Sequence, residues 1–214
     1  MTPHDLRDFD FQDSPVVSTQ TIGGCPAEVV IGAGKSGKVV AFHAADDKRL
    51  WTLEIGKHNR YSTGPLPAHP VVYCPGSLGG VLTPLAEAAN RLYVPWVDVC
   101  VKGSATGLAR YTPKPAGGLA AVRPSTGAVL WKHRFADLDS GAATVANDIV
   151  FTSTFDGTIY ALSTANGSVR STAKAPAGIN AFPAVTRTML LVGAGAPTRA
   201  KHPRYELVAY SLPG

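Results

Sequence analysis

Hydrophobic residues in this chain occur in short runs or alternate with polar residues, and Gly, Pro, Asn or Asp bounds most of these stretches. Examples are AEVVIGAG, TPLAEAANRLYVPW, AATVANDIVFTST and FPAVTRTMLLVGAG. Short alternating runs between turn residues are typical of β-strands. No apolar stretch approaches the roughly 18 residues that a membrane-spanning helix needs. The pattern predicts an all-β protein made of short strands joined by tight turns.

One sequence unit recurs along the chain. Its three full copies and a partial fourth copy are GKVVAFHAADDKRLW at 37–51, GGLAAVRPSTGAVLW at 117–131, GTIYALSTANGSVRS at 157–171 and YELVAYSLPG at 205–214. The full copies align without gaps, and Gly127 and Gly167 share the position of Asp47 in a polar turn. Residues 56–81 and 101–116 interrupt the spacing and are predicted to be insertions. A period of about 40 residues built of several short strands indicates β-propeller blades.

We therefore predict a single domain over residues 1–214 that forms a β-propeller of about four blades. The blade-like units lie at about 10–55, 80–135, 140–175 and 178–214. The first unit has no strand before residue 14 and the last one ends at its third strand, so the predicted propeller is partial. Trp51 and Trp131 occupy the same repeat position. They are predicted to pack between blades, because one blade cannot bury both faces of its sheet by itself.

Composition agrees with this architecture and narrows the possible functions. The chain has 22 Gly and 17 Pro, and only 16% of its residues are charged, which favours many turns. Its formal charge of +5 is scattered, which argues against a nucleic-acid surface. The first residues lack a signal-peptide pattern. The three cysteines form no CxxC pair, so the sequence does not predict a zinc site. Cys74 and Cys100 could form a disulfide in an oxidising compartment, which would leave Cys25 unpaired.

Two places carry candidate chemistry. Near the N-terminus, HDLRDFDFQDSPVV places Asp5, Asp8 and Asp10 ahead of an apolar strand. These acids could serve as a base or bind a cation, or they could cap a turn by bonding to backbone amides. His4 could be a general base or a turn histidine. Lys35, in the turn Gly-Lys-Ser-Gly, could contact a cofactor or be a solvated hairpin tip, and its spacing does not fit a nucleotide-binding P-loop.

The repeats resemble those of the eight-bladed pyrroloquinoline quinone (PQQ) propellers, through V.PSTGAVLW at 122–131 and the turn ANG. Three further segments are similar to PQQ-dependent sugar and alcohol dehydrogenases. HDLRDFDFQDSPVV resembles their segment with a catalytic Trp-Asp, and VVIGAGKSGKVVAF at 29–42 resembles the strand whose lysine meets PQQ. AGINAFPAVTRTMLLVGAG…ELVAYSLPG, from 177 on, resembles their closing segment. By resemblance, the chain is the C-terminal half of a quinoprotein propeller.

This resemblance implies that Asp8 is the catalytic group, that Lys35 binds the cofactor and that Asp10 contributes to a metal site. It implies PQQ and Ca²⁺ as cofactors and an alcohol or a sugar as substrate. It also implies a periplasmic or extracellular location and an N-terminal half, or a second copy, that closes the ring. Neither nucleic acid nor a membrane span is expected.

Two departures keep a second function open. Arg7 replaces the aromatic residue that precedes the catalytic aspartate in the family, and a cation there would lower the pKa of Asp8 and weaken it as a base. The neighbouring cysteine pair of the alcohol enzymes is also absent. The alternative is a non-catalytic PQQ-like propeller that serves as a protein-interaction or cell-surface binding scaffold.

Overall fold

The computed structural model of this protein describes residues 7–197 and 204–211, and within them every regular element is a β-strand. Four antiparallel sheets follow one another along the chain. The first contains β1 (Val16–Ile22), β2 (Cys25–Ala33), β3 (Lys38–His43) and β4 (Arg49–Glu54). The second contains β6 (Ala86–Ala88), β7 (Arg91–Asp98), β10 (Ala116–Val122) and β11 (Val129–Phe135). The third contains β12 (Thr144–Ala146), β13 (Ile149–Ser153), β14 (Thr158–Ser163) and β15 (Val169–Lys174). The fourth contains β16 (Gly178–Ile179), β17 (Ala184–Val185), β18 (Met189–Ala196) and β19 (Glu206–Ser211).

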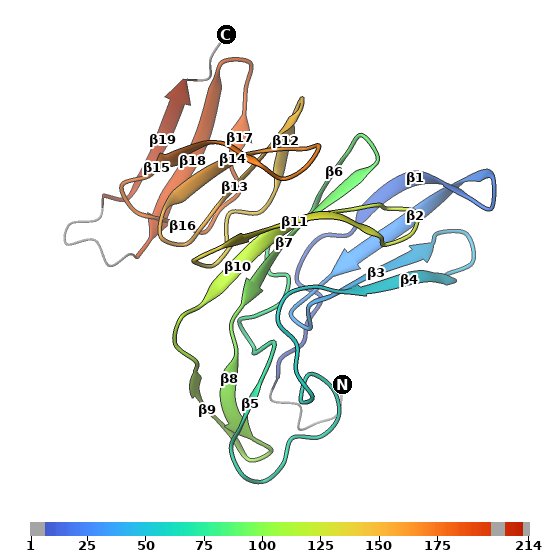
Figure 1. The fold of residues 1–214 in the computed structure, drawn as a ribbon, viewed down its shortest axis with the longest axis vertical. Helices are drawn as coiled ribbons and strands as arrows, with labels where there is room; N and C mark the ends of the chain where they lie inside the picture. The colour runs from blue at the N-terminus through green and yellow to red at the C-terminus, as the bar shows by residue number, and fades with distance from the viewer. Residues whose placement is uncertain (1–6, 198–203, 212–214) are drawn as a thin grey trace.

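The sheets are blades arranged in an open arc, which confirms the predicted partial propeller (Figure 1). The strands of the first and third sheets pair in chain order, and the first sheet has all four strands although none precedes residue 14. In the fourth sheet β19 pairs only with β18 and ends the described part of the sheet. Strands β1, β6, β12 and β17, one from each sheet, contact one another in succession, so they form the inner side of the arc.

The sequence repeat is also a repeat of backbone geometry. Each of the strands β3, β10 and β14 has a register irregularity at the same repeat position, just after Ala41, Ala121 and Ala161. The turn that follows contains Asp47, Gly127 and Gly167, and all three have φ between 55° and 72°. The three aligned sequence units are therefore the same pair of outer strands in three consecutive blades.

Tryptophan side chains join consecutive blades as predicted. The Trp51 indole N–H donates a hydrogen bond to the carbonyl of Pro124 in the next blade at 2.8 Å, and Trp131 donates to Thr164 at 2.9 Å. Each ring lies against the turn glycine of that next blade. A Cβ atom at Gly127 would lie 2.7 Å from the Trp51 ring. This position therefore requires glycine for its backbone conformation and for the close approach of the ring.

Three apolar cores fill the spaces between consecutive sheets. On β7, Leu92 and Val94 belong to the core shared with the first sheet, whereas Tyr93 belongs to the core shared with the third sheet. Both faces of the interior blades are thus buried. This burial explains why their strands are continuous apolar runs rather than alternating ones.

The two predicted insertions form a small sheet of their own. Strand β5 (Val71–Tyr73) pairs with β8 (Val101–Ser104), which pairs with β9 (Gly107–Tyr111). A disulfide between Cys74 and Cys100 joins the two insertions, and Cys25 is a free, exposed thiol. This small sheet projects from the blades below β7 and β10 in Figure 1.

Candidate functional site

The turn between β2 and β3 lies inside the molecule rather than at its surface. The Lys35 amide donates a hydrogen bond to the carbonyl of Asp10 at 3.0 Å, and Val81 N–H donates to the carbonyl of Gly34 at 3.0 Å. Ile55 N–H donates to the carbonyl of Gly37 at 2.8 Å. Segments from three parts of the chain therefore enclose the turn. The interpretation of Lys35 as a solvated hairpin tip is wrong, because its side chain is only 9% exposed.

The Lys35 ammonium lies between two carboxylates. Its Nζ is 2.6 Å from Asp8 Oδ2 and 3.3 Å from Asp10 Oδ2. The structure thus brings together the three residues that the sequence singled out as catalytic, cofactor-binding and metal-binding candidates. The two carboxylates remain about half exposed, at 54% and 41%. Solvent or a ligand can therefore approach the cluster from the acidic side.

The charges in this cluster support one another. The hydrogen bond with Lys35 is the main cause that lowers the pKa of Asp8, and Asp10 and the Lys35 charge add to it. The hydrogen bond with Asp8 raises the pKa of Lys35 although burial opposes it. Opposite charges favour each other's ionised forms at this distance. At neutral pH Asp8 is therefore a carboxylate and Lys35 an ammonium.

Arg7 is not the cause of the low pKa of Asp8, which corrects the sequence-based expectation. Its Nη1 donates a hydrogen bond to the carbonyl of Gly64 at 2.8 Å and a longer one to Tyr61 at 3.4 Å. Its guanidinium carbon lies 5.3 Å from the centre of the Phe9 ring. The arginine therefore fastens the segment around Asp8 to the loop at 61–64.

Two further residues that the sequence did not single out hold the Lys35 turn. His58 lies with Nε2 3.1 Å from the carbonyl oxygen of Ser36. Asp98 is buried, accepts a hydrogen bond from Lys57 N–H at 2.7 Å and pairs with Arg134 at 2.7 Å. Together they fix the loop 55–58 against the turn. The sequence signal for this packing is slight: Gly37 and Gly56, both with positive φ, leave room for the His58 ring and the Asp98 carboxylate.

Two candidates, His4 and Asp5, lie outside the described residues, and the metal role predicted for Asp10 is untested. Within residues 7–197 and 204–211, no group of three or more His, Cys, Asp or Glu side chains could hold a metal ion. The Asp10 carboxylate instead contacts the Lys35 ammonium. Its role as a metal ligand stays a prediction.

Comparisons with known proteins agree with this architecture. The family described as outer membrane protein assembly factor BamB matches residues 115–209. No curated protein sequence matches the chain significantly. A europium-containing methanol dehydrogenase superposes with a TM-score of 0.72 over 90% of this chain at 15% identity. The quinohemoprotein alcohol dehydrogenase of Comamonas testosteroni gives 0.70 over 89% at 18%, and that of Pseudomonas putida HK5 gives 0.68 over 86% at 16%.

The chain spans 41%, 35% and 34% of the lengths of these three dehydrogenases. At such identities the likeness concerns the fold, which it reproduces over most of the chain. The family match adds the repeat type over β10 and β11 of the second blade and over the third and fourth blades. The chain therefore has a partial β-propeller fold, and its residues 115–209 match a PQQ-like repeat family.

Proposed function

We propose that this chain is part of a PQQ-dependent dehydrogenase-like propeller that oxidises an alcohol or a sugar when it is complete. One observation carries the proposal: a buried lysine at the β2–β3 turn holds its ammonium between two half-exposed carboxylates. A fixed positive charge beside acids that reach solvent suits a site where an anionic cofactor and a hydroxyl substrate meet.

The described residues fit PQQ better than they fit calcium. Lys35 keeps its ammonium charged at neutral pH, and such a charge can stabilise the negative charge that develops on quinone oxygens during reduction. Calcium needs several oxygen ligands, and no cluster of three acidic or other metal-binding side chains occurs among the described residues. We therefore infer that a calcium site would take most of its ligands from elsewhere, with Asp10 contributing one carboxylate.

The residues of this chain would have separate roles. PQQ, when bound, would accept the two electrons of the alcohol. Asp8 would accept the hydroxyl proton on its carboxylate, because its lowered pKa keeps it ionised at neutral pH. The same lowered pKa makes Asp8 a weak base, so its main contribution would be to orient the hydroxyl. Lys35 would hold the quinone oxygens and keep the Asp8 carboxylate in place.

The test is a titration with PQQ and Ca²⁺, followed by the absorbance of the cofactor and by dye reduction with alcohols and sugars. It uses the chain and a longer form of the protein that extends it upstream. We expect the longer form to bind PQQ, Lys35→Ala to weaken binding, and Asp8→Asn to lose turnover while it still binds. Lys57→Ala is the matched control, because this lysine is exposed beside the same turn. Absence of PQQ binding in the longer form would contradict the proposal.

A scaffold function is the second candidate, and the same cluster favours it. Lys35, Asp8 and Asp10 satisfy one another, so they could serve only to lock the segment at 8–11 onto the turn. In that case the propeller would present its loops to protein partners or to cell-surface polymers. Lys35→Ala would then lower stability, and no form of the protein would bind PQQ.

We also propose a periplasmic or extracellular location. The Cys74–Cys100 disulfide supports an oxidising compartment, because such bonds are rare in reducing ones. Within the described residues, none of the secondary structure is a helix with the length and apolarity to cross a membrane.

A further inference from the structure

A hollow lies at the same end of the blades as the Lys35 turn, but between later blades. Its volume is about 920 Å³, which is within the range of pockets that hold small molecules. The segments at 113–115, 136–138 and 174–177 line it, together with Phe155 and Asp156 of the β13–β14 turn. None of the residues of the Lys35 cluster lines this hollow, so it is a separate site.

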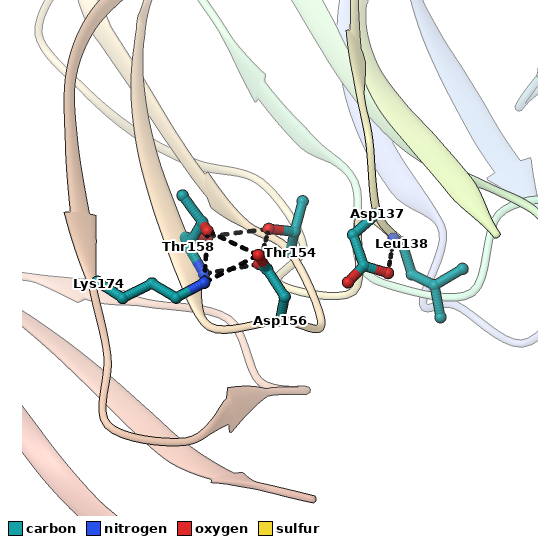
Figure 2. Close-up of polar contacts among 6 residues, drawn as sticks. All are labelled: Asp137, Leu138, Thr154, Asp156, Thr158 and Lys174. Atoms are coloured by element: carbon teal, nitrogen blue, oxygen red, sulfur yellow. Dashed lines mark hydrogen bonds and ion pairs between the residues drawn. The ribbon is translucent and has the colours of Figure 1, made fainter. Parts of the chain in front are cut away.

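One wall of the hollow is a polar cluster, which Figure 2 shows around Asp156. The Asp156 carboxylate accepts hydrogen bonds from Thr154 Oγ1 at 2.7 Å and from Thr158 N–H at 3.0 Å. Lys174 Nζ lies 2.8 Å from Asp156 and 2.9 Å from Thr158 Oγ1. An ammonium has three N–H donors, so this geometry leaves one of them for a ligand. Thr158 Oγ1 also donates to Asp156 Oδ2 at 3.0 Å, so the carboxylate already accepts four hydrogen bonds. This wall therefore offers a ligand the remaining donor of Lys174.

The opposite wall carries Asp137, which stands apart from the Asp156 cluster in Figure 2. One of its carboxylate oxygens accepts the Leu138 amide at 2.7 Å. Lys114 also lines the hollow, so its charged groups are two lysines and two aspartates. The lining therefore has no net charge. An anion would meet both carboxylates and a cation would meet both ammonium groups, so the charges favour a neutral ligand with hydroxyl groups.

The rest of the lining is apolar. It includes Leu138, Phe155 and four prolines, at positions 113, 115, 176 and 197. Apolar surface beside separated polar groups matches a sugar ring, which has C–H faces and a rim of hydroxyls. We propose that this hollow binds a neutral carbohydrate, with its hydroxyls on Asp137 and Lys174 and its apolar faces on Phe155 and Leu138.

A comparison between blades supports this assignment. Phe155 occupies the same repeat position as Lys35, because each residue precedes its turn glycine by two positions. Their backbone contacts are also equivalent: Lys35 N–H donates to the carbonyl of Asp10, and Phe155 N–H donates to that of Leu138. One place in the fold thus presents an ammonium in the first blade and an aromatic ring in the third. The third-blade turn therefore offers an apolar surface where the first blade offers a charge.

The experiment titrates the chain with three neutral trisaccharides, maltotriose, cellotriose and chitotriose, by calorimetry and saturation-transfer NMR. We expect at least one of them to bind with a Kd on the order of 1 mM. Asp137→Asn keeps the acceptor for the Leu138 amide but removes the charge, and we expect it to weaken binding about tenfold. Phe155→Leu keeps an apolar side chain but removes the ring, and we expect a similar loss.

Two control variants should bind as the unchanged protein does. Lys57→Ala changes an exposed lysine beside the Lys35 turn, and Asp46→Asn lies in an exposed turn at the other end of the first blade. Failure of all three sugars to bind would overturn the proposal, as would binding that Asp137→Asn and Phe155→Leu leave unchanged. Loss of binding in Lys57→Ala would place the sugar beside the Lys35 turn and overturn it too. This proposal does not rest on PQQ chemistry, so failure of the PQQ titration would leave it standing.

Discussion

The environment of single acidic residues decides their chemistry in this protein. Asp8 has its pKa lowered by an ammonium, whereas burial raises the pKa of Asp139 well above its usual range although Thr152 donates a hydrogen bond to it. The two residues differ in their three-dimensional surroundings, which the neighbouring sequence does not reveal. Sequence reasoning could therefore name Asp8 as a candidate, but it could not name its charge partner correctly.

Replacing Lys35 should release the pKa of Asp8. In Lys35→Met the main partner of the carboxylate is gone, so we expect the pKa of Asp8 to rise toward its ordinary value. The measurement is a pH titration of the aspartate side-chain carbons by NMR. Arg7→Met is the matched control and should leave the Asp8 pKa almost unchanged, because this guanidinium bonds to the loop at 61–64. A larger shift in Arg7→Met than in Lys35→Met would contradict the assignment.

Asp13 should make stability depend on pH. Burial raises its pKa from 3.8 to about 6, and its Oδ2 atom is buried without a hydrogen bond among the described residues. The folded state then binds more protons than the unfolded state between these two values, so this residue's contribution to stability falls as the pH rises through that window. We expect Asp13→Asn to be more stable than the parent above pH 6.

Urea unfolding on both sides of this window checks the prediction about Asp13. The difference in unfolding free energy between Asp13→Asn and the parent should grow from acidic to neutral pH. Asp148→Asn, in an exposed turn, is the control. An equal difference at both pH values would show that Asp13 is not the titrating group.

At the scale of the element, replacing a turn glycine by alanine can destabilise the fold in two ways, through backbone strain and through a steric clash. Gly127 has a φ of 72° and lies under the Trp51 ring, whereas Gly23 has a φ of 60° and nothing near its would-be Cβ. Gly23→Ala therefore measures the backbone cost alone, which we expect to be about 1 kcal/mol. Gly127→Ala adds a clash with the ring, and we expect a total of about 2–4 kcal/mol.

Chemical denaturation of the two glycine variants tests this difference. Equal losses of stability in both would mean that the Trp51 ring moves aside freely. Trp51→Phe provides a further check, because it removes the indole N–H that bonds to Pro124. In that background the extra cost of Gly127→Ala should shrink, since a smaller ring leaves space for the methyl group.

The elements could be predicted from the sequence where their pairing is local. The aligned units give β3 with β4, β10 with β11 and β14 with β15, since each pair is a hairpin. The sheet β5-β8-β9 was missed, because β5 and β8 come from separate insertions. The same reason explains the candidate site. Asp8 and Lys35 could be named together as site candidates because their segments resemble those of a known family. The support from His58 and Asp98 could not be predicted, because it depends on packing between distant loops.

At the scale of the whole molecule, the arc leaves the Lys35 cluster open on one side. The described blades provide Lys35 and two acids but no cluster of metal-binding side chains. The dehydrogenases that share the fold are more than twice as long as this chain. We therefore expect purified 1–214 to show no dye reduction with added PQQ and Ca²⁺, because a half ring would leave the cofactor without its second wall. Turnover by this chain, lost in Asp8→Asn, would contradict that expectation.

The two end faces of the arc should make the chain associate. On the first blade Val17 and Phe42 are 60% and 38% exposed, and both pair across the sheet with Val30. On the fourth blade Met189 and Leu207 are 45% and 72% exposed. In the interior blades the equivalent faces are covered by the next blade. Uncovered apolar faces of this kind favour association, either with further blades or with a second copy.

Light scattering of 1–214 over a range of concentrations measures this association. We expect the mean mass to rise with concentration, and Leu207→Lys to shift it toward the monomer, because a charge cannot be buried without a partner. Val169→Lys is the matched control: this valine is 41% exposed, but it lies on the outer strand β15 of an interior blade. A monomer at all concentrations would mean that the end faces are stable in water. Equal effects of the two lysine variants would show that general charge, rather than the fourth-blade face, governs association.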